Sequence, residues 1–115
     1  MKIKKIKYNN LIIANTFLKR AIGLLLYKTL DENQGMLFYN TTQIHTFFMR
    51  FSIDVIFCNK AGQVFAIYKN LRPFRVTKSY SRSYQGLVLE FKAGYVDINN
   101  LEIGDYLSIN GHFLP

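Results

Sequence analysis

The segment from His45 to Asp54 places side chains that can do chemistry among apolar residues. Asp54 lies within the apolar run 53–57, and an unpaired carboxylate is costly to bury. We therefore expect a partner for Asp54. The candidates are His45, Arg50 and Arg72.

Two interpretations of this set stay open at the level of sequence. In the functional one, His45 and Asp54 form an acid/base pair or a ligand-binding dyad. In the structural one, an ion pair of Asp54 fixes the His45 loop to a sheet, since charged networks also serve architecture. The structural interpretation is favoured for the pair. The residues that could line or order a binding site are His45, Arg50, Asp54 and Arg72.

A metal or nucleophile site has weaker support. His45, Met49 and Cys58 are soft-metal ligand types, but their spacing matches no zinc pattern. Met and Cys at such positions are more often core residues. Cys58 lies in a predicted strand without an obvious activating charge, so it is a poor nucleophile candidate. We predict no metal, no cofactor and no catalytic residue, and enzymatic activity is left undecided.

The stretch 69–84 is the clearest electrostatic feature, because no acid occurs between Val55 and Leu89. Its cations and rings are Lys69, Arg72, Arg75, Lys78 and Arg82 with Phe74, Tyr80 and Tyr84. Rings next to cations suit single-stranded nucleic acid, although no recognised nucleic-acid motif is present. A solvated surface loop is the favoured alternative, since charge runs are usually solvated. A lid over a pocket is a third interpretation.

The composition sets limits on the class of protein. The chain has 115 residues, 50% hydrophobic and 16% aromatic, which predicts a single domain over 1–115 with a real core. The formal charge of +8 favours an anionic partner, and the single Cys58 excludes an internal disulfide. No segment has the roughly 20 apolar residues of a transmembrane helix. The basic start is followed by an apolar run too short for a secretion signal, so we expect a cytoplasmic protein.

Hydropathy patterns predict short strands and one helix. The predicted strands are an N-terminal pair within 3–13 with a basic edge strand, then 36–39, 47–58, 63–68, 87–91 and a last strand ending near 109. An apolar face at helical spacing predicts a helix from Thr16 to about Leu26. The fold class is therefore a mainly β, compact sandwich or barrel of about six or seven short strands with one packed helix.

Ordered blocks along the chain resemble a known family. The central block is His45 to Phe57, with the sequence HTFFMRFSIDVIF, and flanking blocks are RAIGL at 20–24, GMLF at 35–38, GQV at 62–64, LRP at 71–73, VLE at 88–90, AG at 93–94 and IGD at 103–105. Together they resemble domain-of-unknown-function family 192, over roughly Asn15 to Ile109. Ser52 departs from the proline usual in that family at this turn. The resemblance implies a compact, mainly β domain and no established activity.

The sequence thus favours a small β domain with an accessory role, which binds a small ligand or a protein around the HTFFMRFSID segment. The alternative is a nucleic-acid-binding protein that uses the basic and aromatic stretch 69–84.

Overall fold

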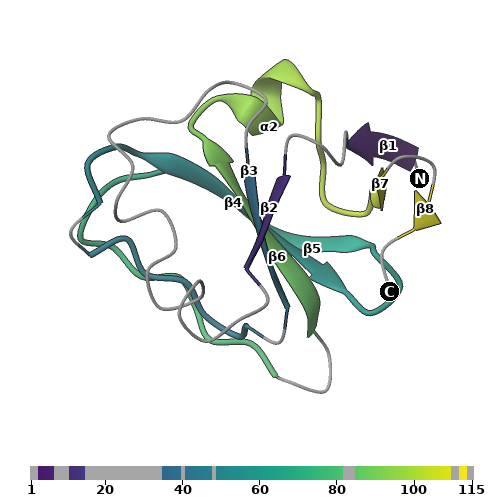
Figure 1. The fold of residues 1–115 in the computed structure, drawn as a ribbon, viewed down its shortest axis with the longest axis horizontal. Coiled ribbons are helices and arrows are strands. Elements are labelled where there is room, and N and C mark those ends of the chain that lie inside the picture. The colour runs from purple at the N-terminus through teal and green to yellow at the C-terminus, as the bar shows by residue number, and fades with distance from the viewer. Residues whose placement is uncertain are drawn as a thin grey trace.

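The computed structural model describes residues 3–6, 11–14, 35–39, 41–47, 49–81, 85–109 and 112–113 (Figure 1). The elements are β1 (Ile3–Ile6), β2 (Leu11–Ala14), β3 (Gly35–Tyr39), β4 (Ile53–Asn59), β5 (Val64–Leu71), β6 (Gln85–Lys92), α2 (Tyr95–Ile98), β7 (Tyr106–Ile109) and β8 (His112–Phe113). The mainly β class is confirmed, because strands in two sheets form most of the described regular structure.

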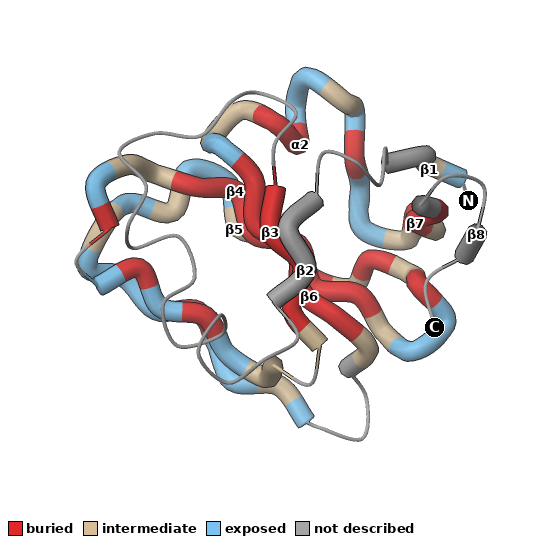
Figure 2. The backbone as a smooth tube through the Cα atoms, in the orientation of Figure 1, coloured by how far each residue is buried: buried red, intermediate tan, exposed pale blue. Residues whose placement is uncertain are grey.

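The larger sheet has the strand order β2-β3-β6-β4-β5. β2 runs parallel to β3, and the other neighbours are antiparallel. β4 and β5 form the hairpin expected around the turn at Asn59, whose side-chain oxygen accepts hydrogen bonds from the amides of Ala61 and Gln63. β4 and β6 occupy interior positions of this sheet, and the residues from Ile53 to Cys58 are all buried (Figure 2). Such two-sided burial is what a strand with apolar residues on both of its faces requires.

The smaller sheet has the order β1-β7-β8, with β1 parallel to β7 at an edge. This placement confirms the predicted basic edge strand, where lysines discourage pairing with another chain. The two sheets meet where the start of β5 contacts the turn before β7: Gln63 bridges Tyr106, and the Val64 amide donates to the Asp105 carbonyl over 2.8 Å.

Apolar side chains cover both faces of the larger sheet. Alternation along β6 sends Leu87, Leu89 and Phe91 to one face and Val88 to the other. The first face packs against α2, the loop after it and β7, through Tyr95, Val96, Leu101 and Leu107. The second face packs against the segment that precedes β4, through Ile44 and Met49. We call these the helix face and the loop face.

The predicted strand 47–58 is wrong in its first half, because the strand begins only at Ile53. Before it, the Met49 amide donates to the Thr46 carbonyl in a turn, and Met49 contributes its side chain to the loop face. The predicted helix from Thr16 to about Leu26 lies outside the described residues.

Gly35 permits an unusually close approach of an aromatic ring. It pairs with Phe91 across β3 and β6, and a Cβ added at Gly35 would lie 2.3 Å from the Phe91 ring. That ring has no free space to retreat, because it is fully buried and stacked on Tyr95 with centroids 3.6 Å apart. The glycine is therefore required by packing.

We predict that Gly35→Ala lowers the free energy of unfolding by about 1–3 kcal/mol, as overpacking does. Chemical denaturation measures the change. In a Phe91→Leu background the same substitution should be less costly, because the ring that it meets is gone. Equal costs in the two backgrounds would contradict this account.

Candidate functional site

Two segments, 42–46 and 74–80, are paired along their backbones, and they carry several of the predicted site residues. The Thr46 amide donates to the Arg75 carbonyl, the Phe74 amide to the Thr46 carbonyl, and the Thr77 amide to the Ile44 carbonyl, all within 2.9–3.0 Å. The Tyr80 amide donates to the Thr42 carbonyl. The basic stretch is therefore not a freely solvated loop over 74–80. It is held against 42–46, which in turn lies on the loop face.

Two buried threonine hydroxyls fix this pairing. Thr46 is fully buried, and its hydroxyl donates to the Arg72 carbonyl over 2.6 Å and accepts from the Arg75 amide over 2.9 Å. The Thr77 hydroxyl accepts from the Ile44 amide and donates to the Lys78 carbonyl. Each hydroxyl both donates and accepts a hydrogen bond. These bonds hold the main chain next to the exposed side chains in one arrangement.

Three rings lie on the outer side of the paired segments. His45 and Phe47 are stacked with centroids 5.1 Å apart, and Phe47 and Phe74 follow at 6.4 Å. Phe47 is 42% exposed and Phe74 is 56% exposed. Phe74 also has a φ of 63°, a left-handed conformation that is costly for a bulky residue.

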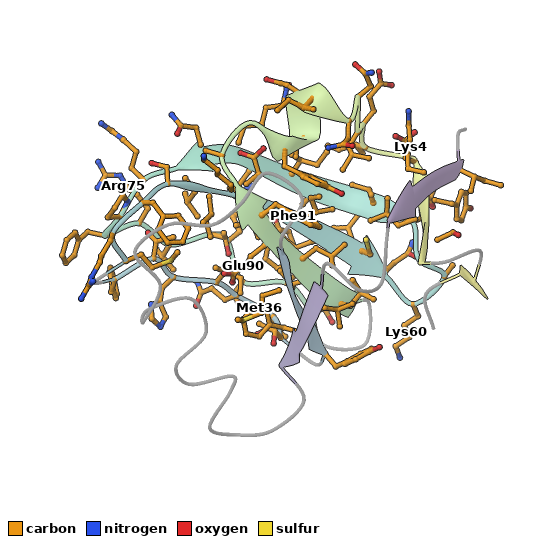
Figure 3. The ribbon with its side chains drawn as sticks, turned by 45° about the horizontal axis from the view of Figure 1, so that its top comes forward. Lys4, Met36, Lys60, Arg75, Glu90 and Phe91 are labelled. Atoms are coloured by element: carbon orange, nitrogen blue, oxygen red, sulfur yellow. The ribbon has the colours of Figure 1, made fainter. Side chains whose placement is uncertain are left out.

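Cations adjoin these rings in the chain. Arg72 and Arg75 are exposed on either side of Phe74, and Val76 is 53% exposed next to them. We call His45, Phe47, Arg72, Phe74, Arg75 and Val76 the ring–arginine surface. Lys78 is exposed in the 74–80 segment, and Arg50 is exposed between the 42–46 segment and β4. Figure 3 shows Arg75 at the opposite end of the molecule from Lys60.

Other predicted residues of the basic stretch have partners elsewhere. Lys69 forms a salt bridge with Asp97 at 2.8 Å, and this carboxylate raises the pKa of the Lys69 ammonium. Tyr80 packs its ring against Phe57 and Phe65. Its hydroxyl lies 2.7 Å from that of Tyr68, and burial followed by this hydrogen bond raises the pKa of Tyr80 to about 12. Arg82 and Tyr84 lie outside the described residues.

Asp54 is a buried hydrogen-bond acceptor on the helix face. Its Oδ1 accepts from the Asn70 amide over 2.9 Å, and its Oδ2 accepts from the amides of Gly94 and Val96 over 3.1 and 2.9 Å. Asn70 and Gly94 both have positive φ. A single carboxylate thus satisfies the turn that ends β5 and the start of α2, which explains its 1% exposure without an arginine partner.

The proposed dyad of His45 and Asp54 is not formed. His45 is exposed in the segment that covers the loop face, whereas Asp54 bonds to backbone at the helix face. Within the described ranges, the salt bridge is that of Lys69 and Asp97, so neither Arg50 nor Arg72 is the ionic partner of Asp54. The Arg72 carbonyl lies at Thr46, next to His45 in the chain, whereas Asp54 bonds to the backbone at Asn70, Gly94 and Val96.

Glu90 is a second acid within an apolar run that sequence reasoning did not select. It lies in the middle of β6, pairs with Met36 and Val55, and is 4% exposed. Among described residues no hydrogen-bond donor or cation contacts its carboxyl, and desolvation raises its pKa to about 8. The rule that drew attention to Asp54, an acid flanked by buried apolar residues, applies equally to Glu90 and could have found it.

Cys58 is a buried thiol of low reactivity. It is fully buried in the core of the helix face, and desolvation raises the pKa of its thiol to about 12. Since the thiolate is the reactive form, Cys58 is not a nucleophile at neutral pH. In the ranges the structure describes, no three His, Cys, Asp or Glu side chains gather as a metal site, and no helix is long and apolar enough to span a membrane.

The fold and these side chains define a compact, mainly β protein with an exposed aromatic and basic surface. The chain belongs to the DUF192 family, described as "Uncharacterized ACR", whose model matches residues 2–109. The resemblance of the ordered blocks is thereby confirmed.

Relatives and solved structures agree with this family and fold. A UPF0127 protein of Thermococcus sibiricus is 38% identical over 81% of the chain, and the match spans 61% of that protein's length. A UPF0127 protein of Pyrococcus abyssi is 32% identical over 89% of the chain and 88% of its own length.

Two crystal structures share the fold. A protein of unknown function from Novosphingobium aromaticivorans has a TM-score of 0.71 at 22% identity, over 82% of this chain and 70% of its own. A protein of Sinorhizobium meliloti, which carries the name of a candidate transcription regulator, has a TM-score of 0.72 at 24% identity, over 82% and 76%.

We predict that Asp54→Asn lowers the free energy of unfolding by about 3 kcal/mol, because the amide NH₂ would oppose backbone donors that now face a carboxylate oxygen. Urea denaturation at pH 7 measures it. Asp97→Asn removes an exposed carboxylate and should change stability by well under about 1 kcal/mol. Similar effects of the two substitutions would refute the structural role of Asp54.

We predict a second stability effect for Glu90. Its pKa is raised on folding from about 4.5 to about 8, so the stability contributed by its neutral form is complete below about pH 4.5 and is lost as pH rises through about 8. Relative to Glu90→Gln, the wild type should lose about 1.4 kcal/mol per pH unit across that window. Unfolding measured from pH 4 to 9 tests this, with the exposed Glu102→Gln as control. Parallel pH profiles for wild type and Glu90→Gln would contradict it.

Proposed function

We propose that the protein binds single-stranded nucleic acid on the ring–arginine surface. The observation that carries the proposal is the pair of exposed phenylalanines, Phe47 and Phe74, with centroids 6.4 Å apart and arginines on both sides of Phe74. Unpaired bases stack on such rings, while guanidinium groups meet the phosphates. Phe47 and Phe74 belong to segments that hydrogen bonds hold together, so the two stacking positions are preorganised.

The distribution of charge supports an anionic partner. Of the five acids within the described residues, three are buried, Asp54, Glu90 and Asp105, and Asp97 is engaged by Lys69. Arg50, Arg72, Arg75 and Lys78 have no salt bridge among the described residues. A phosphate backbone would supply the missing counter-charge and would release condensed ions on binding.

This proposal replaces a small-ligand site at His45, Arg50, Asp54 and Arg72, because Asp54 is committed to backbone amides on the helix face. His45 and Arg72 remain, as members of the new surface. We also propose that the chain forms a single domain over 1–115. It would act in the cytoplasm, where single-stranded nucleic acid is available.

Fluorescence anisotropy with a labelled oligothymidylate and an oligouridylate tests the proposal. We expect log affinity to fall linearly with log salt, and Arg75→Gln should reduce the slope by about 0.7, the value for one phosphate contact on a single strand. Phe74→Ala should weaken binding about tenfold at fixed salt, because a stacking position is lost.

Lys60→Gln is the matched control, since it removes an exposed cation at the far end of the molecule (Figure 3). It should reduce affinity much less than Arg75→Gln. Absence of binding at low salt, or equal losses for Lys60→Gln and Arg75→Gln, would reject the proposal. Binding to vesicles of phosphatidylserine but to neither oligonucleotide would reassign the surface to a membrane and also reject it.

A further inference from the structure

The segment that carries Phe47 turns every second side chain outward. Ile44 and Thr46 are buried, whereas Gln43, His45 and Phe47 are exposed. This alternation is that of an extended chain, in which residues two apart project from the same side and lie about 7 Å from each other. Gln43 is therefore the next outward residue after Phe47 and His45, and the three form one row on the surface.

The side-chain amide of Gln43 is fixed on one side and open on the other. Its Nε2 donates to the Thr77 carbonyl over 2.9 Å. Because a carbonyl oxygen can only accept, this bond sets which way the amide points. Within the described residues, the Oε1 atom and the second N–H of Gln43 have no hydrogen-bond partner, and the residue is exposed. The amide thus presents one donor and one acceptor to solvent in a set orientation.

A cation lies at the same end of the row. His45 forms a bridge with Val76 in antiparallel orientation, so Lys78 lies toward Gln43 rather than toward Phe47. Lys78 is exposed, and its main chain is held on both sides. Its amide donates to the Tyr68 hydroxyl over 3.1 Å, and its carbonyl accepts from the Thr77 hydroxyl over 2.9 Å. This end of the row therefore combines an oriented amide with a positive charge.

We propose that the unpaired strand runs along this row from Phe47 to Gln43, and that Gln43 hydrogen-bonds the edge of a base. The inference rests on the nucleic-acid function proposed above and adds base recognition to it. Single strands expose base edges on which donors and acceptors lie side by side. The open donor and acceptor of the Gln43 amide match such an edge. Lys78 meets a phosphate beside it.

The length of the row sets the size of the site. Two steps of extended chain place the Cα atoms of Phe47 and Gln43 about 13 Å apart. That length takes about four nucleotides at the stacked spacing of about 3.4 Å for each strand, and fewer when the strand is extended. The substrate class is therefore a short unpaired strand that carries its bases, with stacking at one end of the row and a polar base contact at the other.

Fluorescence anisotropy with two oligothymidylates, one unmodified and one methylated at every thymine N3, tests the proposal. Methylation removes the N3–H donor but keeps the ring and the phosphates, so stacking and charge are preserved. We expect the wild type to bind the unmodified oligomer about threefold or more tightly than the methylated one, the effect of one hydrogen bond.

Gln43→Met keeps the length of the side chain without its amide, and it should bind both oligomers as the wild type binds the methylated one. Gln63→Met is the matched control, because Gln63 also donates its Nε2 to a main-chain carbonyl, that of Gly104. It should keep the wild-type preference. Phe74→Ala should weaken both oligomers equally. Lys78→Gln should reduce the slope of log affinity against log salt by about 0.7.

The possible failures are distinguishable. Equal affinity of the wild type for the two oligomers would overturn base recognition and leave the nucleic-acid proposal standing, and this result requires no variant. Binding of neither oligomer at low salt would reject both proposals. A preference that survives in Gln43→Met would remove Gln43 from the site. An unchanged salt slope in Lys78→Gln would overturn the path along the row.

Discussion

Burial of β4 and β6 on both faces is the constraint on which the rest of the structure depends. Two interior strands that bury every side chain from Ile53 to Cys58 and from Leu87 to Phe91 need a covering layer on each side. On one side, α2 and β7 supply that layer. On the other, irregular backbone supplies Ile44 and Met49. That backbone has no sheet of its own to join, so its polar groups must be satisfied by a second segment, and 74–80 provides the partners.

This arrangement also explains the exposed positions of the rings on the outer side of the paired segments. Ile44 and Thr46 face inward, so the alternate residues His45 and Phe47 face outward. The partner segment buries Thr77 and leaves Phe74, Arg75 and Val76 in solvent. The same backbone pairing that covers the loop face therefore presents the ring–arginine surface, so the segments that complete the core also carry the proposed binding surface.

The two buried acids of the interior strands have the same sequence pattern but different surroundings. Asp54 and Glu90 each interrupt an apolar strand. Asp54 faces backbone amides at strained turns, so its charge is used to hold the chain together. Glu90 faces Met36 and Val55, so its neutral form is favoured and its hydrogen-bonding capacity is unused by the described residues. Strand position decides the outcome, because neighbouring registers point to opposite faces of the sheet.

By itself the sequence determined the mainly β class, the β4–β5 hairpin, the basic edge strand and the family, because these follow from alternation, turn residues and ordered motifs that are local in the chain. Composition also predicts an anionic partner. The tertiary structure alone decided that Phe47 and Phe74 lie together, that Asp54 is separated from His45, and that Glu90 is unpartnered in the described residues. Each of these depends on which residues far apart in the chain meet across a sheet or loop pair, and one sequence does not specify that pairing.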